Sequence, residues 1–181
     1  YTDMLYARLQ RDGYLKRDAQ RLVNQDRNVF GCCMLKNGDA DGMVTGVTRN
    51  YDVALNDSLL VLDPIPGQAV IGMSMVINRG RTVFIADTSV TELPQGEDLA
   101  NIAMESARAV RSLGFSPRVA FLSYSTFGNP MGERGEKVRE AVAILDSMGG
   151  IDFEYEGDMS ADVALNPSHK LLYPFSRLTG P

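Results

Sequence analysis

The sequence predicts an α/β fold in which helices cover both faces of a mostly parallel sheet. The chain has 181 residues and is 44% hydrophobic, which is enough to bury a core. From about residue 70 onward, short apolar β-branched runs alternate with longer segments of helical periodicity. This alternation is typical of α/β proteins, whose ligands bind at the carboxyl ends of the strands.

The first third of the chain is predicted to be mainly helical. Apolar residues at helical spacing occupy the first 36 residues, with an interruption at Gly13, and residues 51–62 form another helical segment. Between them lie a glycine-rich turn at residues 38–42 and a short strand candidate at 43–45.

The remaining elements follow in regular order. The runs at 70–78 and 82–86 are joined at Asn78 to Arg81 and are expected to form a hairpin. We then expect helices at 96–113, 133–148 and 161–172, the last disturbed at Pro167, and strands at 118–122 and 151–155.

Composition excludes several classes of protein. The net charge of -5 is spread along the chain, which argues against a nucleic-acid surface. No apolar stretch reaches the 18 or so residues of a membrane span, and no signal-peptide pattern is present, so we expect a cytoplasmic protein. The only cysteines, Cys32 and Cys33, are adjacent and are expected to be buried thiols. His169 is the only histidine, which leaves few ligands for a transition metal.

The most informative segment lies between the strand at 118–122 and the helix at 133–148. It carries hydroxyl and amide side chains close to a predicted helix N-terminus, where backbone amides can receive an anion. We assign Ser123, Ser125, Thr126 and Asn129 to this candidate ligand site. An ordinary Ser/Thr-rich connection is the alternative. Neither a Walker motif nor a G-x-G-x-x-G fingerprint is present.

Two further groups are candidates for the same site. Thr45, Thr48, Arg49 and Asn50 follow the strand candidate at 43–45 and suit a phosphate or carboxylate, although a surface turn is the alternative. Asp162 and Asn166 follow the strand at 151–155, together with Asp158 and Ser160. A role in a cleft competes there with simple helix capping.

These segments, taken in order, resemble the phosphate acetyltransferase family. The strand Arg118 to Ser125 and the helical segment Lys137 to Ala141 match family patterns, as does the glycine-acid turn that leads into Val44 to Gly46. A still closer resemblance is to the version of this domain fused behind the catalytic part of NADP-dependent malic enzymes. That version shares Val44 to Asn50, Tyr124 to Gly128, Ala161 to Asn166 and Tyr173 to Thr179.

The resemblance implies a three-layer αβα fold like that of isocitrate and isopropylmalate dehydrogenases, with two lobes. By that resemblance residues 1–50 belong to the first lobe and residues 51–181 mainly to the second. It also implies that the chain is a fragment of a larger domain truncated at its C-terminus, and that such domains form homodimers within larger homo-oligomers.

The resemblance further implies an acetyl-CoA-binding regulatory domain. NADP and a divalent metal would belong to a malate-decarboxylating part outside this chain, and acetyl-CoA or coenzyme A would be the partner here. Acetyl transfer is expected to be absent, with no catalytic residue assigned, because Asn56 stands where transferases carry an arginine. An active phosphate acetyltransferase and a purely structural dimerisation domain are the alternatives.

Overall fold

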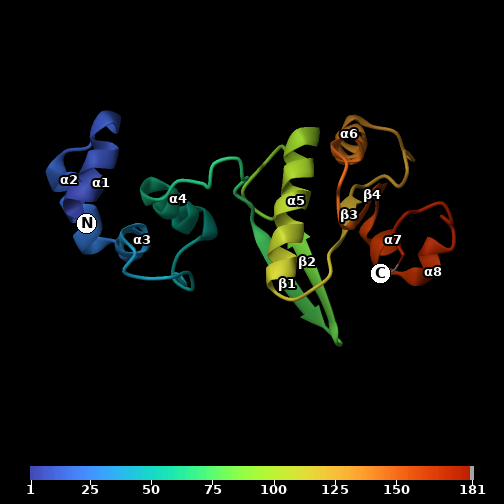
Figure 1. Ribbon diagram of the computed structural model, residues 1–181, viewed down its shortest axis with the longest axis horizontal. Coiled ribbons are helices and arrows are strands. Elements are labelled where there is room, and N and C mark those ends of the chain that lie inside the picture. The colour runs from blue at the N-terminus through green and yellow to red at the C-terminus, as the bar shows by residue number, and fades with distance from the viewer. Residues whose placement is uncertain (180–181) are drawn as a thin grey trace. The chain divides into compact units, whose positions relative to one another are not determined.

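The computed structural model describes residues 1–179 and separates the chain into two units, the first ending at Pro66 and the second beginning at Gly67 (Figure 1). We call them the N-terminal unit and the C-terminal unit. The N-terminal unit is helical, as the sequence predicts. Its elements are α1 (Thr2–Leu9), the 3₁₀ turn Gln10–Asp12, α2 (Lys16–Gln25), α3 (Arg27–Asn37) and α4 (Tyr51–Val61).

Helix α3 shows how local sequence sets these boundaries. The Asp26 carboxylate accepts hydrogen bonds from the amides of Asn28 and Val29, which caps the N-terminus. Gly38 ends the helix in the left-handed conformation at φ 79°. Between these caps, Val29, Cys32 and Cys33 are buried in the core of the unit, and both cysteines are free thiols.

The strand expected at residues 43–45 does not form, so that prediction is wrong. Residues 43–46 have neither helical nor strand geometry, and Val44 and Val47 are fully exposed. The apolar pattern alone could not specify a partner strand. The Thr45 side chain is instead tied to α3 through a hydrogen bond to Asn28.

The C-terminal unit contains the four strands of the described residues, and its elements largely match those predicted. They are β1 (Met73–Asn78), β2 (Arg81–Ala86), α5 (Gly96–Ser112), β3 (Arg118–Leu122), α6 (Glu133–Met148), β4 (Glu154–Met159), α7 (Ala161–Leu165) and α8 (Pro167–Lys170). Buried side chains of α5, β3 and α6 form one core cluster, which includes Ala103, Phe121 and Leu145.

The sheet arrangement corrects the expected fold class. Among residues 1–179 the strands form two separate two-stranded sheets, the antiparallel hairpin β1–β2 and the parallel pair β3–β4 (Figure 1). The single large sheet of a three-layer αβα, isocitrate/isopropylmalate dehydrogenase-like fold is therefore absent from these residues. The two-residue turn at Arg79 and Gly80 pairs β1 with β2 as an antiparallel hairpin. A β-branched run predicts a strand but does not specify which other strand it pairs with, so the expected single sheet could not be derived from the runs alone.

The assignment of residues 1–50 and 51–181 to two lobes remains a prediction, since the two units are described separately. Within residues 1–179, no helix combines the length and the apolar character that crossing a bilayer requires.

Candidate functional site

The predicted ligand loop lies at the carboxyl end of the parallel pair β3–β4. Residues 123–132 connect β3 to α6, and the end of β4 lies beside them because the Ser123 amide donates to the Met159 carbonyl at 2.9 Å. This is the edge at which parallel strands are expected to present a binding site. We call residues 123–132 the ligand loop.

The Asp158 carboxylate organises the ligand loop from within the unit. Asp158 and Ser125 are both fully buried, and the Ser125 hydroxyl donates a short hydrogen bond to Asp158. The Gly128 amide donates to the same carboxylate at 3.2 Å, and Arg139 of α6 donates at 3.3 Å. Burial raises the pKa of Asp158, but the hydrogen bonds from Ser125 and Arg139 outweigh it and hold the pKa below its ordinary value.

Helix α6 accommodates this cluster because its third residue is a glycine. A Cβ atom at Gly135 would lie 2.7 Å from Ser125 Oγ and 3.2 Å from Asp158 Oδ2. Only a residue without a side chain lets Ser125 and Asp158 approach the helix backbone this closely.

The rest of the ligand loop is held by its backbone and by an aromatic side chain. Thr126 and Asn129 exchange backbone hydrogen bonds of 2.9 and 3.2 Å. The Asn129 side chain is exposed. Phe127 has a positive φ of 48° and packs on Tyr173 and Phe175, with ring centroids 5.2 and 4.8 Å away. Thr126 Oγ1 lies 3.3 Å from Ser160 Oγ, which brings the segment after β4 into contact with the loop.

The two candidates beyond Ser160 occupy different environments. Asp162 is exposed on α7, and its carboxylate lies 3.0 Å from His169 Nδ1. The Asn166 side chain accepts a hydrogen bond from the Ser168 amide and so caps α8. For Asn166 the structure shows the capping contact, which was the alternative to a role in a cleft.

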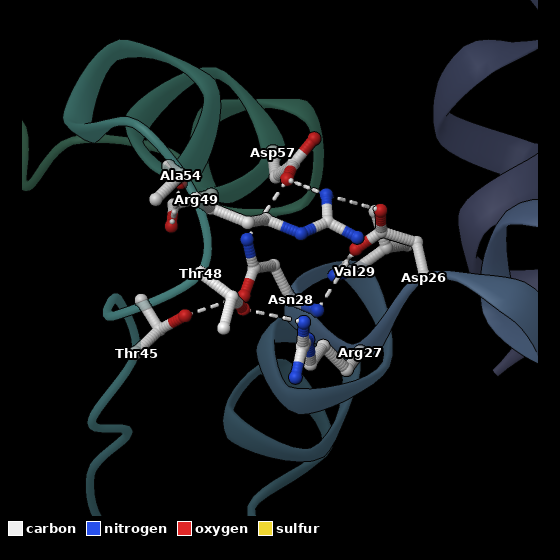
Figure 2. A network of polar contacts seen from close by, with 10 residues as sticks. Asp26, Arg27, Asn28, Val29, Thr45, Thr48, Arg49, Ala54 and Asp57 are labelled. Carbon is white, nitrogen blue, oxygen red and sulfur yellow. Dashed lines mark hydrogen bonds and ion pairs between the residues drawn. The ribbon is translucent and has the colours of Figure 1, made fainter.

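The remaining candidates lie in the N-terminal unit, where Arg49 joins two helices (Figure 2). Its Nη1 atom lies 2.7 Å from the Asp26 carboxylate at the start of α3 and 3.0 Å from the Asp57 carboxylate of α4. The buried Asn28 donates to Asp57 at 2.9 Å, as Figure 2 shows. The charge of Arg49 is thus shared by two carboxylates, with which any anionic ligand would have to compete.

Thr45 and Thr48 are tied to the same part of α3. Thr45 Oγ1 donates to Asn28 Oδ1 at 2.5 Å, and Arg27 donates to Thr48 Oγ1 at 2.7 Å (Figure 2). Asn50 is exposed and precedes α4 without a capping hydrogen bond from its side chain. The structure therefore gathers Thr45, Thr48 and Arg49 in one unit and Ser123, Ser125 and Thr126 in the other.

Three residues that organise these groups were not among the predicted site residues. Asp158 was weighed only as one of several polar residues after a strand, and it lies within β4 because that strand runs to Met159. Arg139 lies in the helical segment that matches the family, and Asp57 follows Asn56. Their partners lie between 8 and 33 residues away in the sequence, so no local pattern marked these residues. Among residues 1–179, no group of three or more His, Cys, Asp or Glu side chains could hold a metal ion.

Comparison with known proteins defines the class. A match to the phosphate acetyl/butaryl transferase family covers residues 1–181, and the chain belongs to this family.

Within that family, the chain is similar to one part of the malic enzymes. It is 59% identical over 180 residues to an NADP-dependent malic enzyme of Rhizobium meliloti, covering 99% of this chain and 24% of that protein. It is 44% identical over 189 residues to a probable NADP-dependent malic enzyme of Rickettsia prowazekii. A phosphate acetyltransferase of Corynebacterium glutamicum is 33% identical over 165 residues. The chain thus spans about a quarter of the length of these malic enzymes, and 49% of the acetyltransferase.

The solved structures that match are phosphotransacetylases. One, from Streptococcus pyogenes, has a TM-score of 0.83 and 28% identity, and the match covers 98% of this chain and 55% of that one. The EutD phosphotransacetylase from Staphylococcus aureus has a TM-score of 0.79 and 26% identity over 99% of this chain and 56% of that one. These matches replace the expected isocitrate/isopropylmalate dehydrogenase-like fold with that of the phosphotransacetylases.

Proposed function

We propose that this chain is an acetyl-CoA-binding regulatory domain of an NADP-dependent malic enzyme. Binding would change the activity of a malate-decarboxylating part that lies outside this chain and holds NADP and a divalent metal. The observation that carries the proposal is the ligand loop, which presents hydroxyl and backbone groups at the carboxyl end of β3–β4. The ligand loop belongs to a chain that matches a malic enzyme over 99% of the chain and 24% of the malic enzyme.

The arrangement of cations supports binding without acetyl transfer. Transfer between phosphate and coenzyme A requires positive charge over the phosphate. Asn56 is exposed on α4, where the resemblance implies an arginine, and Arg49 is paired with Asp26 and Asp57. Loss of one preorganised charge contact costs about a hundredfold in rate.

Regulation also requires a route to the catalytic part. Effector binding changes activity only if the two functional states differ in affinity for the effector. We propose that this domain forms a homodimer within a larger homo-oligomer, so that the interface can carry the change.

The experiment measures malate-dependent reduction of NADP by the full-length protein as acetyl-CoA is added. We expect acetyl-CoA to lower the rate, as feedback by a metabolite formed downstream of pyruvate. A rate independent of acetyl-CoA at all concentrations would contradict the regulatory role.

An active phosphate acetyltransferase is the second candidate, and the matches to two phosphotransacetylase structures favour it. An assay of acetyl transfer from acetyl phosphate to coenzyme A separates the two. We expect turnover at least about a hundredfold below an ordinary enzyme rate of about 10 per second. Turnover near the ordinary rate would establish the acetyltransferase instead.

A further inference from the structure

The hydroxyl groups of the ligand loop have a fixed hydrogen-bond direction, and this direction begins at Asp158. A carboxylate can only accept hydrogen bonds. That of Asp158 is fully buried and accepts from Ser125 Oγ, from the Gly128 amide and from the Arg139 guanidinium. The adjacent positive charge keeps Asp158 ionised, so the single hydroxyl proton of Ser125 points to Asp158.

Ser123 is the next member of this chain of hydroxyls. Its Oγ lies 3.0 Å from Ser125 Oγ, and because Ser125 has already used its proton, Ser123 must be the donor. The Ser125 amide also donates to Ser123 Oγ at 3.3 Å. The half-buried Ser123 hydroxyl therefore has no proton left for a ligand and presents one remaining lone pair.

The Thr126 hydroxyl likewise directs its proton into the protein. Thr126 Oγ1 donates to Ser160 Oγ at 3.3 Å. The Ser160 amide in turn donates to Thr126 Oγ1 at 3.2 Å. The three hydroxyls of the ligand loop, on Ser123, Ser125 and Thr126, thus direct their protons into the protein, and a phosphate has only acceptor oxygens to offer near neutral pH.

We propose that Ser123 is a specificity-determining residue that accepts a hydrogen bond from an amide N–H of the pantetheine arm of coenzyme A. The hydroxyls of the ligand loop would then contact this amide-bearing arm and not the phosphates. This inference rests on the proposed binding of acetyl-CoA, and Asp158 acts in it as a positioning residue that sets the direction of the chain.

The test compares two probes by calorimetry on the wild-type protein and on Ser123→Ala. Coenzyme A carries the amide arm together with adenosine and phosphates, whereas adenosine 3′,5′-bisphosphate carries adenosine and phosphates without the arm. Its binding is measured by its displacement of coenzyme A. We expect Ser123→Ala to weaken coenzyme A binding about three- to tenfold and to leave the bisphosphate unchanged. An equal loss for both probes would show that Ser123 holds a phosphate, and no loss for either would show that it does not contact the ligand. Each of these results overturns the proposal.

Asp158→Asn supplies a second readout, because an amide can donate to Ser125 and so release the fixed direction of the chain. We expect this variant to weaken coenzyme A binding on its own but to cause no further loss in a Ser123→Ala background. Additive losses would assign Asp158 a structural role independent of Ser123. If the wild-type protein binds no coenzyme A, the proposed function itself fails, and that result is distinct from a failure of the Ser123 substitution alone.

Discussion

At the scale of single residues, the N-terminal unit depends on one shared cation. Arg49 is three-quarters buried between Asp26 and Asp57, so its removal would leave two partly buried carboxylates facing each other. We expect Arg49→Ala to lower the free energy of unfolding by about 1–3 kcal/mol.

Urea unfolding measures this loss, and Arg11→Ala is the matched control because Arg11 is an exposed arginine of the same unit. The control should change stability by less than about 0.5 kcal/mol. Equal effects of the two substitutions would show that the contacts of Arg49 contribute nothing to stability.

Paired carboxylates also determine how stability depends on pH. Burial raises the pKa of Asp26, but the hydrogen bonds from the Val29 amide and Arg49 outweigh burial and lower it overall. The pKa of Asp158 is likewise lowered overall. A carboxylate whose folded pKa is depressed stabilises the protein above its unfolded pKa of about 3.9, and this contribution is lost as the pH falls toward the folded pKa. We therefore expect the melting temperature to fall steadily between about pH 5 and pH 3 in thermal unfolding scans. A melting temperature unchanged over that range would contradict these contacts.

Sequence reasoning at this scale found the polar residues of the ligand loop but not their partners. Ser125 and Thr126 stand out because hydroxyls gather after a strand. Asp158 pairs with Ser125 from 33 residues away, a separation that no local pattern encodes. Arg49 was assigned to an anionic ligand, yet its neighbours in the fold are the carboxylates of Asp26 and Asp57.

At the scale of elements, the start of α6 requires a glycine beside the ligand loop. A methyl group at Gly135 would press on Ser125 Oγ and Asp158 Oδ2, both buried and unable to move aside. We expect Gly135→Ala to destabilise the protein by about 1–3 kcal/mol and to weaken coenzyme A binding.

The control for this prediction is Gly96→Ala at the start of α5. The three atoms nearest to a methyl group there all belong to the side chain of Glu140, which is exposed and can move aside. The control should be close to neutral, because the gain in helix propensity is at most about 1 kcal/mol. Thermal unfolding compares the two variants. An unchanged melting temperature for Gly135→Ala would show that the cluster can accommodate a methyl group at this position.

Helices were predicted more accurately than sheets, for a physical reason. The periodicity and caps of α5 and α6 lie within the segments themselves, so their predicted limits agree with the structure to within one residue. Strand pairing depends on distant segments. Strand β4 runs from Glu154 to Met159 and not from 151 to 155, and the expected single sheet is two separate pairs.

At the scale of the whole molecule, regulation must act in both directions. If acetyl-CoA lowers the affinity for malate by some factor, malate must lower the affinity for acetyl-CoA by the same factor. We expect a factor of about 5 to 150 in the full-length protein, measured as acetyl-CoA affinity with and without malate. An acetyl-CoA affinity that is independent of malate would exclude coupling at the level of malate binding.

The most direct measurement is a calorimetric titration of acetyl-CoA into the protein, with the melting temperature recorded in parallel. We expect saturable binding and a melting temperature that rises with acetyl-CoA concentration, because a ligand that binds only the folded state stabilises it. No heat of binding together with an unchanged melting temperature would contradict the assignment of this chain as an acetyl-CoA-binding domain.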